Sequence, residues 1–310
     1  MAKTIYEEVV YCLYFGLTDK DTGKQELTMD EAKDIAIPLF ILAGNLMNAG
    51  KITDKIFSFA KELVGWIPGG LGHANVVASI IFAGMSGSAA ADAGGLGTIE
   101  MEAMTKNGYD DDFSGAVTAA SSVIGPIFPP SIPLIIYGAT ASVSVAKLFM
   151  GGVLPGLLMG VALMVLVFLF AIKYKFERHP FHVAALIRQF FGSILSLITP
   201  LIILAGFTTG WFTPTEASSI AVAYSLIIAL IVYRTMDWKT FKHCLLESAI
   251  TSANTLFIIG TSTLFTYVLV KEGASTAIAN FILGISQNPA VILLIINVVL
   301  LILGMFMEPG

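Results

Sequence analysis

The stretch AGMSGSAAADAGGLGT, at residues 83–98, places Ser86, Ser88 and Asp92 among residues that are nearly all small. Hard cations such as Na⁺ prefer oxygen ligands, and two hydroxyls and a carboxylate supply them. Gly87 separates the two serines and favours a break in the backbone, which would add carbonyl oxygens to the set. The pattern predicts a site for a hard cation rather than a transition metal, because neither Cys nor His lies in the stretch.

A second polar stretch, AASSVIGPIFPPSIPLIIYG at residues 119–138, has four prolines between residues 126 and 133. Proline removes a backbone donor and pushes the residue before it out of the helical region. We therefore expect two half-helices joined by an extended break. Ser121, Ser122 and Ser131 lie in or beside this break and bring further hydroxyls to it.

Both breaks lie in apolar sequence, where unwound backbone is tolerated only if it is buried in protein or lines a cavity. Broken helices in transporters coordinate Na⁺ with such backbone and turn half-helix N-termini towards anionic groups. Alternatively, small residues such as Gly87, Ala91 and Gly95 serve helix packing alone, and the prolines only kink a helix. Hydroxyls clustered at two breaks favour the ion site. For Asp92, ion coordination and a position near the membrane interface are both open.

Other candidate residues give weaker evidence of a functional site. Asn75 can cap a helix or order the arms around the first break, and capping is the favoured interpretation. His179 and His182 are three residues apart, but their charged surroundings favour a solvated loop over a metal site. Cys12 and Cys244 form no CxxC pair, which excludes a thiolate metal site and a disulfide framework.

Composition places these breaks in a membrane protein. The 310 residues are 56% hydrophobic and 13% charged, and the mean hydropathy is +0.82. Soluble domains are about 45–50% apolar and about 25% charged. The net charge of −5 includes no basic block suited to nucleic acid. We expect an all-α integral membrane protein with several spans.

The breaks need membrane helices around them. Apolar segments at 35–49, 114–138, 147–172, 193–211, 216–233, 246–270 and 288–307 are the expected spans. Residues 74–104 differ, because two half-length arms flank the break at 86–88, as in a re-entrant hairpin. Lys and Arg in the flanking segments place both ends of this hairpin on the cytoplasmic side.

Two further segments have the pattern of amphipathic helices at the membrane interface. Residues 51–66 are expected to form either such a helix or a cytoplasmic linker helix, and residues 239–249 predict a second short helix. The apolar face of the first comprises Ile52, Ile56, Phe59, Leu63 and Trp66.

Five motifs resemble one family: IPLFILAGNLMNAG, FAGMSGSAAADAGGLGTIEMEAMTKNGYDDDF, AVTAASSVIGPIFPPSIPLIIYG, GVLPGLLMG and FTPTEAS. Residues 35–310 are similar to the large membrane (permease) subunit of tripartite ATP-independent periplasmic (TRAP) transporters, whereas 1–34 is an atypical N-terminal segment. The resemblance implies an elevator-type secondary transporter. Its scaffold domain supports a transport domain with two re-entrant hairpins and two broken helices, arranged as inverted repeats.

The resemblance also divides the chain. It implies a scaffold helix plus an interfacial helix at 35–73, half of the transport domain at 74–146, scaffold spans at 147–249 and the start of the second repeat at 250–310. The transport half contains the hairpin 74–104 and the broken helix 114–138. Because the chain ends at Gly310, where the second hairpin would begin, we expect the second repeat to be incomplete.

The resemblance further implies a site and an activity. By position, Na⁺ would be bound by Ser86, Gly87, Ser88, Gly125 and Pro126, and substrate by Ser88, Phe128, Pro129, Pro130 and Ser131. Asp92 is a further candidate Na⁺ ligand because of its carboxylate. The implied activity is Na⁺-coupled uptake of a small organic acid across a bacterial inner membrane. A small membrane subunit and a periplasmic substrate-binding protein are the implied partners, and no cofactor other than Na⁺ is expected.

Two other functions are possible alternatives to transport. The GMSG sequence around Ser86 fits the nucleophile pattern of an intramembrane serine protease, which needs a membrane-buried histidine nearby. The four histidines, His73, His179, His182 and His243, lie in charged or flanking stretches, which disfavours a protease. The third possibility is a membrane scaffold that does not transport.

Overall fold

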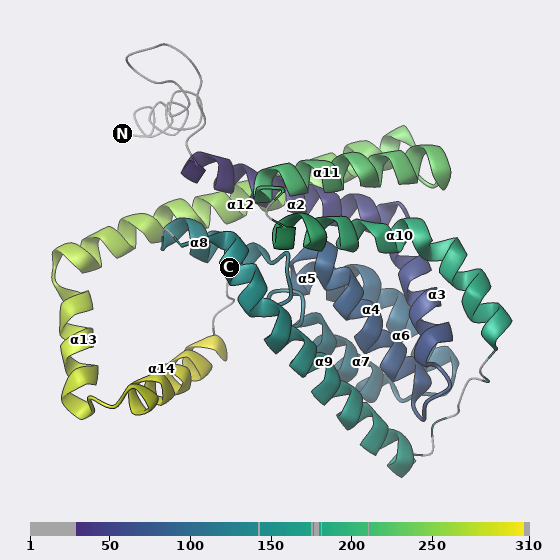
Figure 1. Ribbon diagram of the computed structural model, residues 1–310, viewed down its shortest axis with the longest axis horizontal. Coiled ribbons are helices and arrows are strands. Elements are labelled where there is room, and N and C mark those ends of the chain that lie inside the picture. The colour runs from purple at the N-terminus through teal and green to yellow at the C-terminus, as the bar shows by residue number, and fades with distance from the viewer. Residues whose placement is uncertain are drawn as a thin grey trace. The chain divides into compact units, whose positions relative to one another are not determined.

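The computed structural model describes residues 29–306, apart from 142, 175, 177–179, 181 and 210 (Figure 1). Residues 1–28, and with them Cys12, lie outside the described part, as does His179. The described residues form helices and no strand, which confirms the predicted all-α class. The chain divides into two compact units, Met1–Ala249 and Ile250–Gly310.

The elements follow one another along the chain as helices joined by short connections. They are α2 (Met29–Ala49), α3 (Ile52–Val64), α4 (Gly70–Ser86), α5 (Ala89–Ala91), η1 (Asp92–Leu96), α6 (Gly97–Lys106), α7 (Asp111–Ser122), α8 (Ile132–Thr140), α9 (Val145–Tyr174), α10 (Val183–Thr209), α11 (Pro214–Ile227), η2 (Ile228–Val232), α12 (Trp238–Lys271), α13 (Ala274–Ile285) and α14 (Pro289–Gly304). The elements η1 and η2 are π-helical.

Several of these helices are long and apolar enough to cross a membrane. Four such spans lie in the described residues: Val145–Tyr174, Val183–Gly206, Pro214–Val232 and Trp238–Lys271. A fifth candidate is Ile35–Ala49 together with Ile52–Val64, a pair bent by 70°. A helix of about 20 residues is needed to cross the hydrocarbon core. The chain is therefore a multi-pass membrane protein, as its composition predicts.

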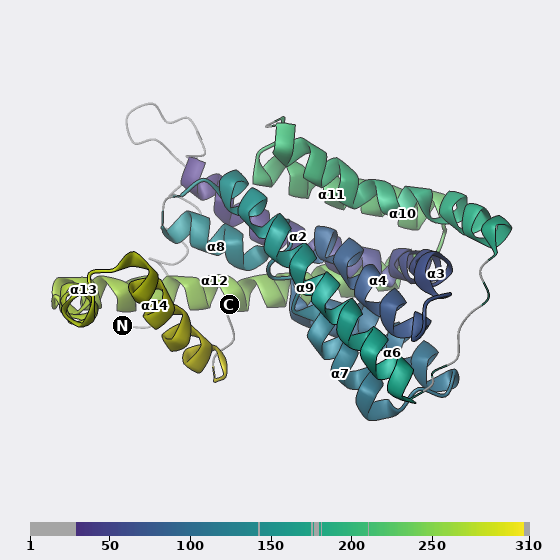
Figure 2. The same ribbon diagram turned by 60° about the horizontal axis from the view of Figure 1, so that its bottom comes forward.

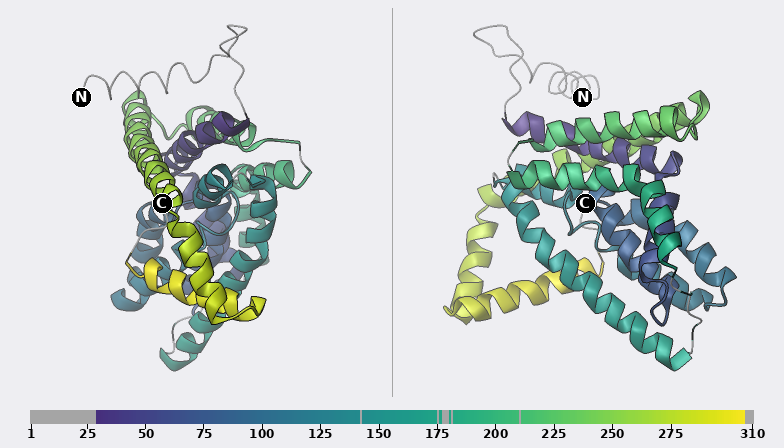
Figure 3. Two further views of the ribbon diagram at one scale, coloured as in Figure 1. Left: turned by 90° about the vertical axis from the view of Figure 1, so that its left-hand side faces the viewer. Right: turned by 45° about the vertical axis from the view of Figure 1, so that its right-hand side comes forward.

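Within the first unit, α2, α10 and α11 run along one side, and α4, α6 and α7 lie beside them (Figures 1 and 3). The helix α11 packs along α2 and also contacts α10, which itself contacts α4. Figure 2 shows α9 lying obliquely across the hairpin helices, where it contacts α4 and α7. The hairpin is therefore held between a layer of long helices and the crossing helix α9.

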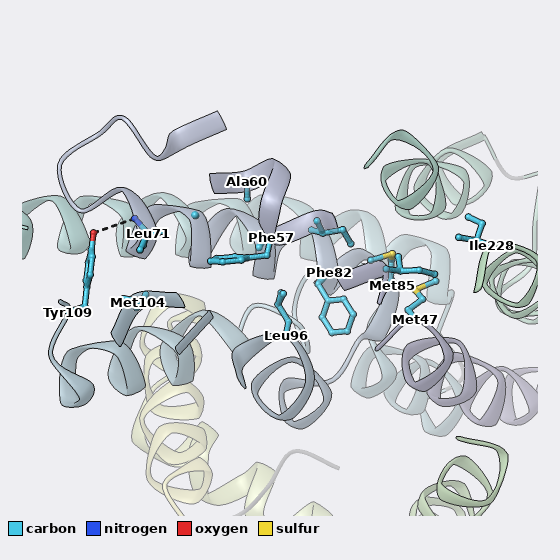
Figure 4. Close-up of a cluster of buried hydrophobic side chains, with 14 residues drawn as sticks. Met47, Phe57, Ala60, Leu71, Phe82, Met85, Leu96, Met104, Tyr109 and Ile228 are labelled. Carbon is cyan, nitrogen blue, oxygen red and sulfur yellow. Dashed lines mark hydrogen bonds between the residues drawn. The ribbon is translucent and has the colours of Figure 1, made fainter. Parts of the chain in front are cut away.

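The main apolar cluster lies between α3 and the two arms of the hairpin, which are α4 and the returning segment from α5 to α6. Figure 4 shows Phe57, Phe82 and Leu96 from α3, α4 and η1 in this cluster, whose members are nearly all fully buried. The Tyr109 hydroxyl accepts a 3.4 Å hydrogen bond from the Leu71 main-chain N–H, which ties the loop after α6 to the start of α4. Burying a large apolar side chain contributes about 1.5–3 kcal/mol, so this cluster holds the arms in place.

The helix α3 buries a face that differs in part from the predicted one. Ile52 and Ile56 are buried as expected, but Leu63 is exposed and Phe57 and Ala60 are buried instead. The reason is that α3 packs against both α4 and α10, so its buried stripe is wider than the face presented to a single surface. The second expected amphipathic helix, 239–249, is the first part of the continuous helix α12.

The second unit comprises the part of α12 from Ile250 onwards, α13 and α14. Gly273, with φ +72°, provides the left-handed residue after the end of α12. Asn288 caps α14 by accepting a hydrogen bond of 3.0 Å from the Ala290 N–H, and Pro289 follows at the first helical position. Gly273 and the Asn288 cap therefore explain the turns between α12 and α13 and between α13 and α14.

Candidate ion and substrate site

The first break is the tip of a helical hairpin, as the sequence predicts. The arm α4 ends at Ser86, and Gly87 adopts φ +61°, a left-handed conformation that glycine reaches without steric cost. Ser88 is extended, and its side chain accepts a 3.4 Å hydrogen bond from the Ala91 N–H, so it caps the returning arm. The arms begin at Gly70 and end at Lys106, slightly beyond the predicted limits of 74 and 104.

The second break interrupts a helix between α7 and α8, again as predicted. After α7 ends at Ser122, the chain stays non-helical until Ser131 caps α8 by accepting a 3.2 Å hydrogen bond from the Leu134 N–H. The Ser131 hydroxyl also donates to the Pro126 carbonyl, which closes the break into a compact loop. Proline explains the interruption, because it cannot donate the helical hydrogen bond.

The tip and the break are in direct contact. The Ile132 N–H donates a 3.3 Å hydrogen bond to the Gly87 carbonyl. A Cβ atom at position 87 would lie 2.6 Å from the Pro130 carbonyl oxygen, and one at position 125 would lie 3.3 Å from the Ser88 carbonyl oxygen. Glycine at 87 thus permits the close approach of the two backbones. The structure brings together these two stretches, which are about forty residues apart in the sequence.

Ser86, the last residue of α4, has a side-chain oxygen without a hydrogen-bond partner among the described residues. Its hydroxyl is buried and makes no hydrogen bond with the described residues. Buried polar groups in proteins nearly always have a partner. Where tip and break meet, the Gly87 carbonyl accepts from the Ile132 N–H, and the Ser88 carbonyl, which accepts from the Asp92 N–H, lies beside Gly125. The Ser86 side chain lies beside α2, where a Cβ at Gly44 would be 3.6 Å from the Ser86 Cβ. An oxygen-rich environment of this kind suits a hard cation.

Ser131 and Phe128, which the resemblance assigns to substrate binding, also stabilise the local structure of the break. The Ser131 hydroxyl is engaged as donor to Pro126 and as cap of α8. Phe128 is buried in an apolar cluster with Val76 and Ala83, and its ring packs against Gly156 of α9. Both residues therefore position the break. Pro129 and Pro130 are buried within it, joined by a cis peptide bond.

Asp92 lies one turn after the tip, as the first residue of η1. It is 1% exposed, and its carboxylate has no hydrogen-bond partner among the described residues. The Ser79 hydroxyl lies close enough to interact with this carboxylate, and it is also 3.1 Å from the Ser121 hydroxyl, to which it can donate. A buried carboxylate without a partner is costly in an apolar interior. The structure buries Asp92 inside the hairpin. Ion coordination and a position near the membrane interface both stay predictions.

Glu100 is a buried acid that sequence reasoning missed. It is fully buried on α6, close enough to interact electrostatically with Asp92, and its carboxylate has no hydrogen-bond partner in the part of the chain that the structure covers. A signal was present, because an acid eight residues after Asp92 returns to the same side of a helix. The sequence alone does not distinguish Glu100 from its neighbour Glu102, which is exposed and pairs with Lys106.

A ladder of polar side chains joins the hairpin to α7. Asn75 Nδ2 donates to Thr118 Oγ1 at 2.7 Å, and Asn75 Oδ1 accepts from Ser121 Oγ at 2.7 Å. Asn75 lies within α4, so the favoured prediction that it caps a helix is wrong and the alternative, that it orders the hairpin, is correct. Ser121 belongs to this ladder rather than to the break, and Ser122 Oγ bonds the Ala119 carbonyl.

The geometry does not assemble a serine protease. His73 lies on the same helix as Ser86, 13 residues away, which is about 20 Å at 1.5 Å per residue. A general base must reach the nucleophile at about 3 Å. His243 is an exposed residue in the second turn of α12, and Ser86 has no imidazole partner among the described residues.

Comparison with known proteins decides the family. The family model described as "Tripartite ATP-independent periplasmic transporter, DctM component" matches residues 5–310. The chain belongs to this family. The match also takes in most of the N-terminal segment 1–34, which the motifs alone left outside the resemblance. Family members are transporter components rather than enzymes.

Named relatives of this chain belong to the same family. It is 45% identical over 278 residues to the sialic acid TRAP transporter large permease protein SiaM of Vibrio cholerae, covering 88% of this chain and 64% of that protein. It is 44% identical over 303 residues to the sialic acid TRAP transporter permease protein SiaT of Haemophilus influenzae, covering 96% and 49%. The C4-dicarboxylate TRAP transporter large permease protein DctM of Pseudomonas aeruginosa is 38% identical over 280 residues, covering 89% and 65%. The chain thus spans half to two thirds of these relatives.

Proposed function

We propose that this chain forms part of the permease of a Na⁺-coupled secondary transporter that takes up a small organic acid. The observation that carries the proposal is the hydrogen-bonded contact between the hairpin tip at Gly87 and the broken helix at Ile132. Two unwound segments meeting among buried oxygens is an arrangement that transporters use for ions and substrates.

The Na⁺ site is assigned to the tip and the bend of the break. Ser86, Gly87, Ser88, Asp92, Gly125 and Pro126 provide hydroxyl, carbonyl and carboxylate oxygens. The buried Ser86 hydroxyl and Asp92 carboxylate have no hydrogen-bond partner among the described residues, and this supports the assignment because such oxygens favour a bound cation. Na⁺ would also fix the tip against the break, so ion binding and the shape of the substrate site would be coupled.

The substrate is assigned to the class of small organic acids. The relatives that transport sialic acid and C4-dicarboxylates both handle carboxylates. In this chain the substrate would lie beside Ser88 and the segment from Phe128 to Ser131. The N-terminus of α8 begins at Ile132, and the partial positive charge of a helix N-terminus favours an anionic group.

The assembly follows from the family. We propose that the permease resides in the bacterial inner membrane, packs against a small membrane subunit and receives substrate from a periplasmic binding protein. Transport would proceed by an elevator movement, in which the hairpin and broken helix move together against the long helices. The direct contact between tip and break supports their movement as one body.

The test is uptake of radiolabelled sialic acid or succinate into proteoliposomes that contain the assembled transporter and its binding protein. We expect uptake to require an inward Na⁺ gradient and to stop when K⁺ replaces Na⁺. Ser86→Ala should raise the Na⁺ concentration for half-maximal uptake about tenfold, equivalent to about 1.4 kcal/mol. The matched control is Ser219→Ala, which removes an exposed hydroxyl that only bonds the Thr215 carbonyl.

Two outcomes would contradict the proposal. Uptake that continues unchanged in K⁺ would exclude Na⁺ coupling while leaving the permease assignment intact. Absence of uptake of any organic acid by a folded assembly would favour the alternative of a membrane scaffold that does not transport.

A further inference from the structure

Two turns that are far apart in the sequence are joined on one side of the first unit. The turn between α2 and α3 contains Gly50, and the turn after η2 contains Thr235. The Thr235 hydroxyl donates a 2.7 Å hydrogen bond to the Gly50 carbonyl. A Cβ at position 50 would lie 2.8 Å from the Ala229 Cβ, so glycine is needed for this approach. The two turns therefore form one fixed surface.

Each turn presents a basic residue next to the bond that joins them. Lys51 follows Gly50 with φ 55°, and Arg234 precedes Thr235 with φ 51°. They are the two non-glycine residues with positive φ in the described part of the chain, and both side chains are exposed. Because their neighbours are hydrogen-bonded to each other, the two cations flank the same junction.

Aromatic side chains extend this basic surface. Lys55 Nζ lies 6.0 Å from the centre of the Tyr233 ring, and the Tyr233 hydroxyl is fixed by a 3.1 Å hydrogen bond with Ser196. Trp238 is 68% exposed, and Lys242 Nζ lies 5.6 Å from its ring centre. Trp and Tyr with neighbouring Lys and Arg are typical of the level of the lipid headgroups.

The charge balance of the surface is positive. We call it the basic junction, and its cations are Lys51, Lys55, Arg234, Lys239 and Lys242, all exposed. Two carboxylates lie among them. Asp54 interacts with Lys51 and Lys55, and Asp237 accepts a 2.8 Å hydrogen bond from the Thr240 N–H at the start of α12. Five cations against two carboxylates leave an excess of three positive charges.

We propose that the basic junction binds the phosphate of an anionic phospholipid. Basic residues placed beside membrane helices attract anionic lipids, with about 1 kcal/mol for each Lys or Arg near the surface. The exposed Trp238 ring gives the site an apolar component that a free anion would not use but a lipid would. Bound lipid would fix the turns that start α3 and α12 at the membrane surface.

The test uses Trp238 as the reporter. The chain has three tryptophans, so the variant Trp66→Phe/Trp211→Phe leaves Trp238 alone. The variant is placed in bilayers that contain either brominated phosphatidylglycerol or brominated phosphatidylcholine, and quenching of Trp238 fluorescence is measured in each. The ratio of the two quenching values gives the binding constant of phosphatidylglycerol relative to phosphatidylcholine. We expect phosphatidylglycerol to be preferred. Adding Lys51→Gln/Arg234→Gln should lower this preference about fivefold for each charge removed.

The matched control is Lys106→Gln/Lys147→Gln, which removes two exposed charges outside the basic junction and should leave the ratio unchanged. Equal quenching by the two lipids, or an unchanged ratio in the Lys51/Arg234 variant, would overturn the proposal. The quenching measurement is then repeated with inorganic phosphate in place of chloride at the same ionic strength. If phosphate abolishes the preference, the site binds a free anion and the proposal fails; if the preference persists, lipid is the ligand.

Discussion

The Gly87 carbonyl accepts a 3.3 Å hydrogen bond from the Ile132 N–H, and this bond joins the tip of the hairpin to the first residue of α8. The contact is possible because position 87 carries no Cβ, which would lie 2.6 Å from the Pro130 carbonyl oxygen. One glycine thus allows two unwound segments to share a surface.

Replacing this glycine should separate the tip from the break. Gly87→Ala introduces a steric conflict with backbone and a left-handed alanine, which itself costs about 1–2 kcal/mol. We expect a loss of stability of about 2 kcal/mol or more, and loss of Na⁺-dependent stabilisation. Thermal unfolding of the purified protein, with NaCl and with choline chloride, measures both.

Gly94→Ala is the matched control, because it lies in the same hairpin and a Cβ there meets nothing within 4 Å. It should be neutral or slightly stabilising. Equal effects of the two substitutions would show that the close approach at Gly87 is unimportant.

The polar ladder between α4 and α7 should be a main determinant of hairpin stability. Asn75→Ala removes two hydrogen bonds of 2.7 Å and leaves the buried Thr118 and Ser121 hydroxyls without that partner. An unsatisfied buried group costs about 1–3 kcal/mol. Chemical unfolding of Asn75→Ala should show this loss, whereas Asn107→Ala, which removes an exposed side chain bonded to the Ala103 carbonyl, should show little change. A neutral Asn75→Ala would contradict the ladder.

The two buried carboxylates should differ in their role. Asp92 lies one turn from the tip, whereas Glu100 lies two turns deeper in the returning arm. If Asp92 is a Na⁺ ligand, Asp92→Asn should reduce the apparent Na⁺ affinity at least about tenfold. The Na⁺ dependence of the unfolding temperature measures this affinity, because a ligand of the folded state stabilises it.

Glu100→Gln replaces the other buried carboxyl of the same hairpin with an amide of similar size. It should keep the Na⁺ dependence and should not lower stability, because the unpaired buried carboxylate is itself unfavourable. If both variants lose Na⁺ affinity equally, the ion lies deeper than the tip.

Acid should weaken the start of α12 through Asp237. The Thr240 hydroxyl and main-chain N–H donate hydrogen bonds to this carboxylate, which lowers its pKa below the usual value near 3.8. A carboxylate with a lowered pKa stabilises the fold above its unfolded pKa, and that contribution is lost as pH falls through the folded pKa. Asp237→Asn keeps the cap at neutral pH. Its unfolding temperature should therefore fall less than that of the parent between pH 5 and about pH 3; parallel curves would exclude this role.

Sequence alone determined the class of protein and the positions of both breaks. High mean hydropathy over lengths near 20 residues leaves helices as the local solution in a membrane. Proline and glycine act on their own backbone, so the interruptions at Gly87 and between Ser122 and Ser131 are local properties of the chain. The same reasoning holds for Thr213, whose capping box with Glu216 starts α11.

Tertiary structure decided which partners each polar side chain meets. Asn75 could cap a helix or cross-link two helices, and only the packing of α4 against α7 gave it Thr118 and Ser121 as partners. Glu100 and Glu102 are indistinguishable by type, yet one faces the interior of the hairpin and the other pairs with Lys106 in solvent. Burial depends on what covers a residue, and the covering segments are distant in the sequence. For the same reason, the junction of Gly50 with Thr235 becomes visible only in the folded chain.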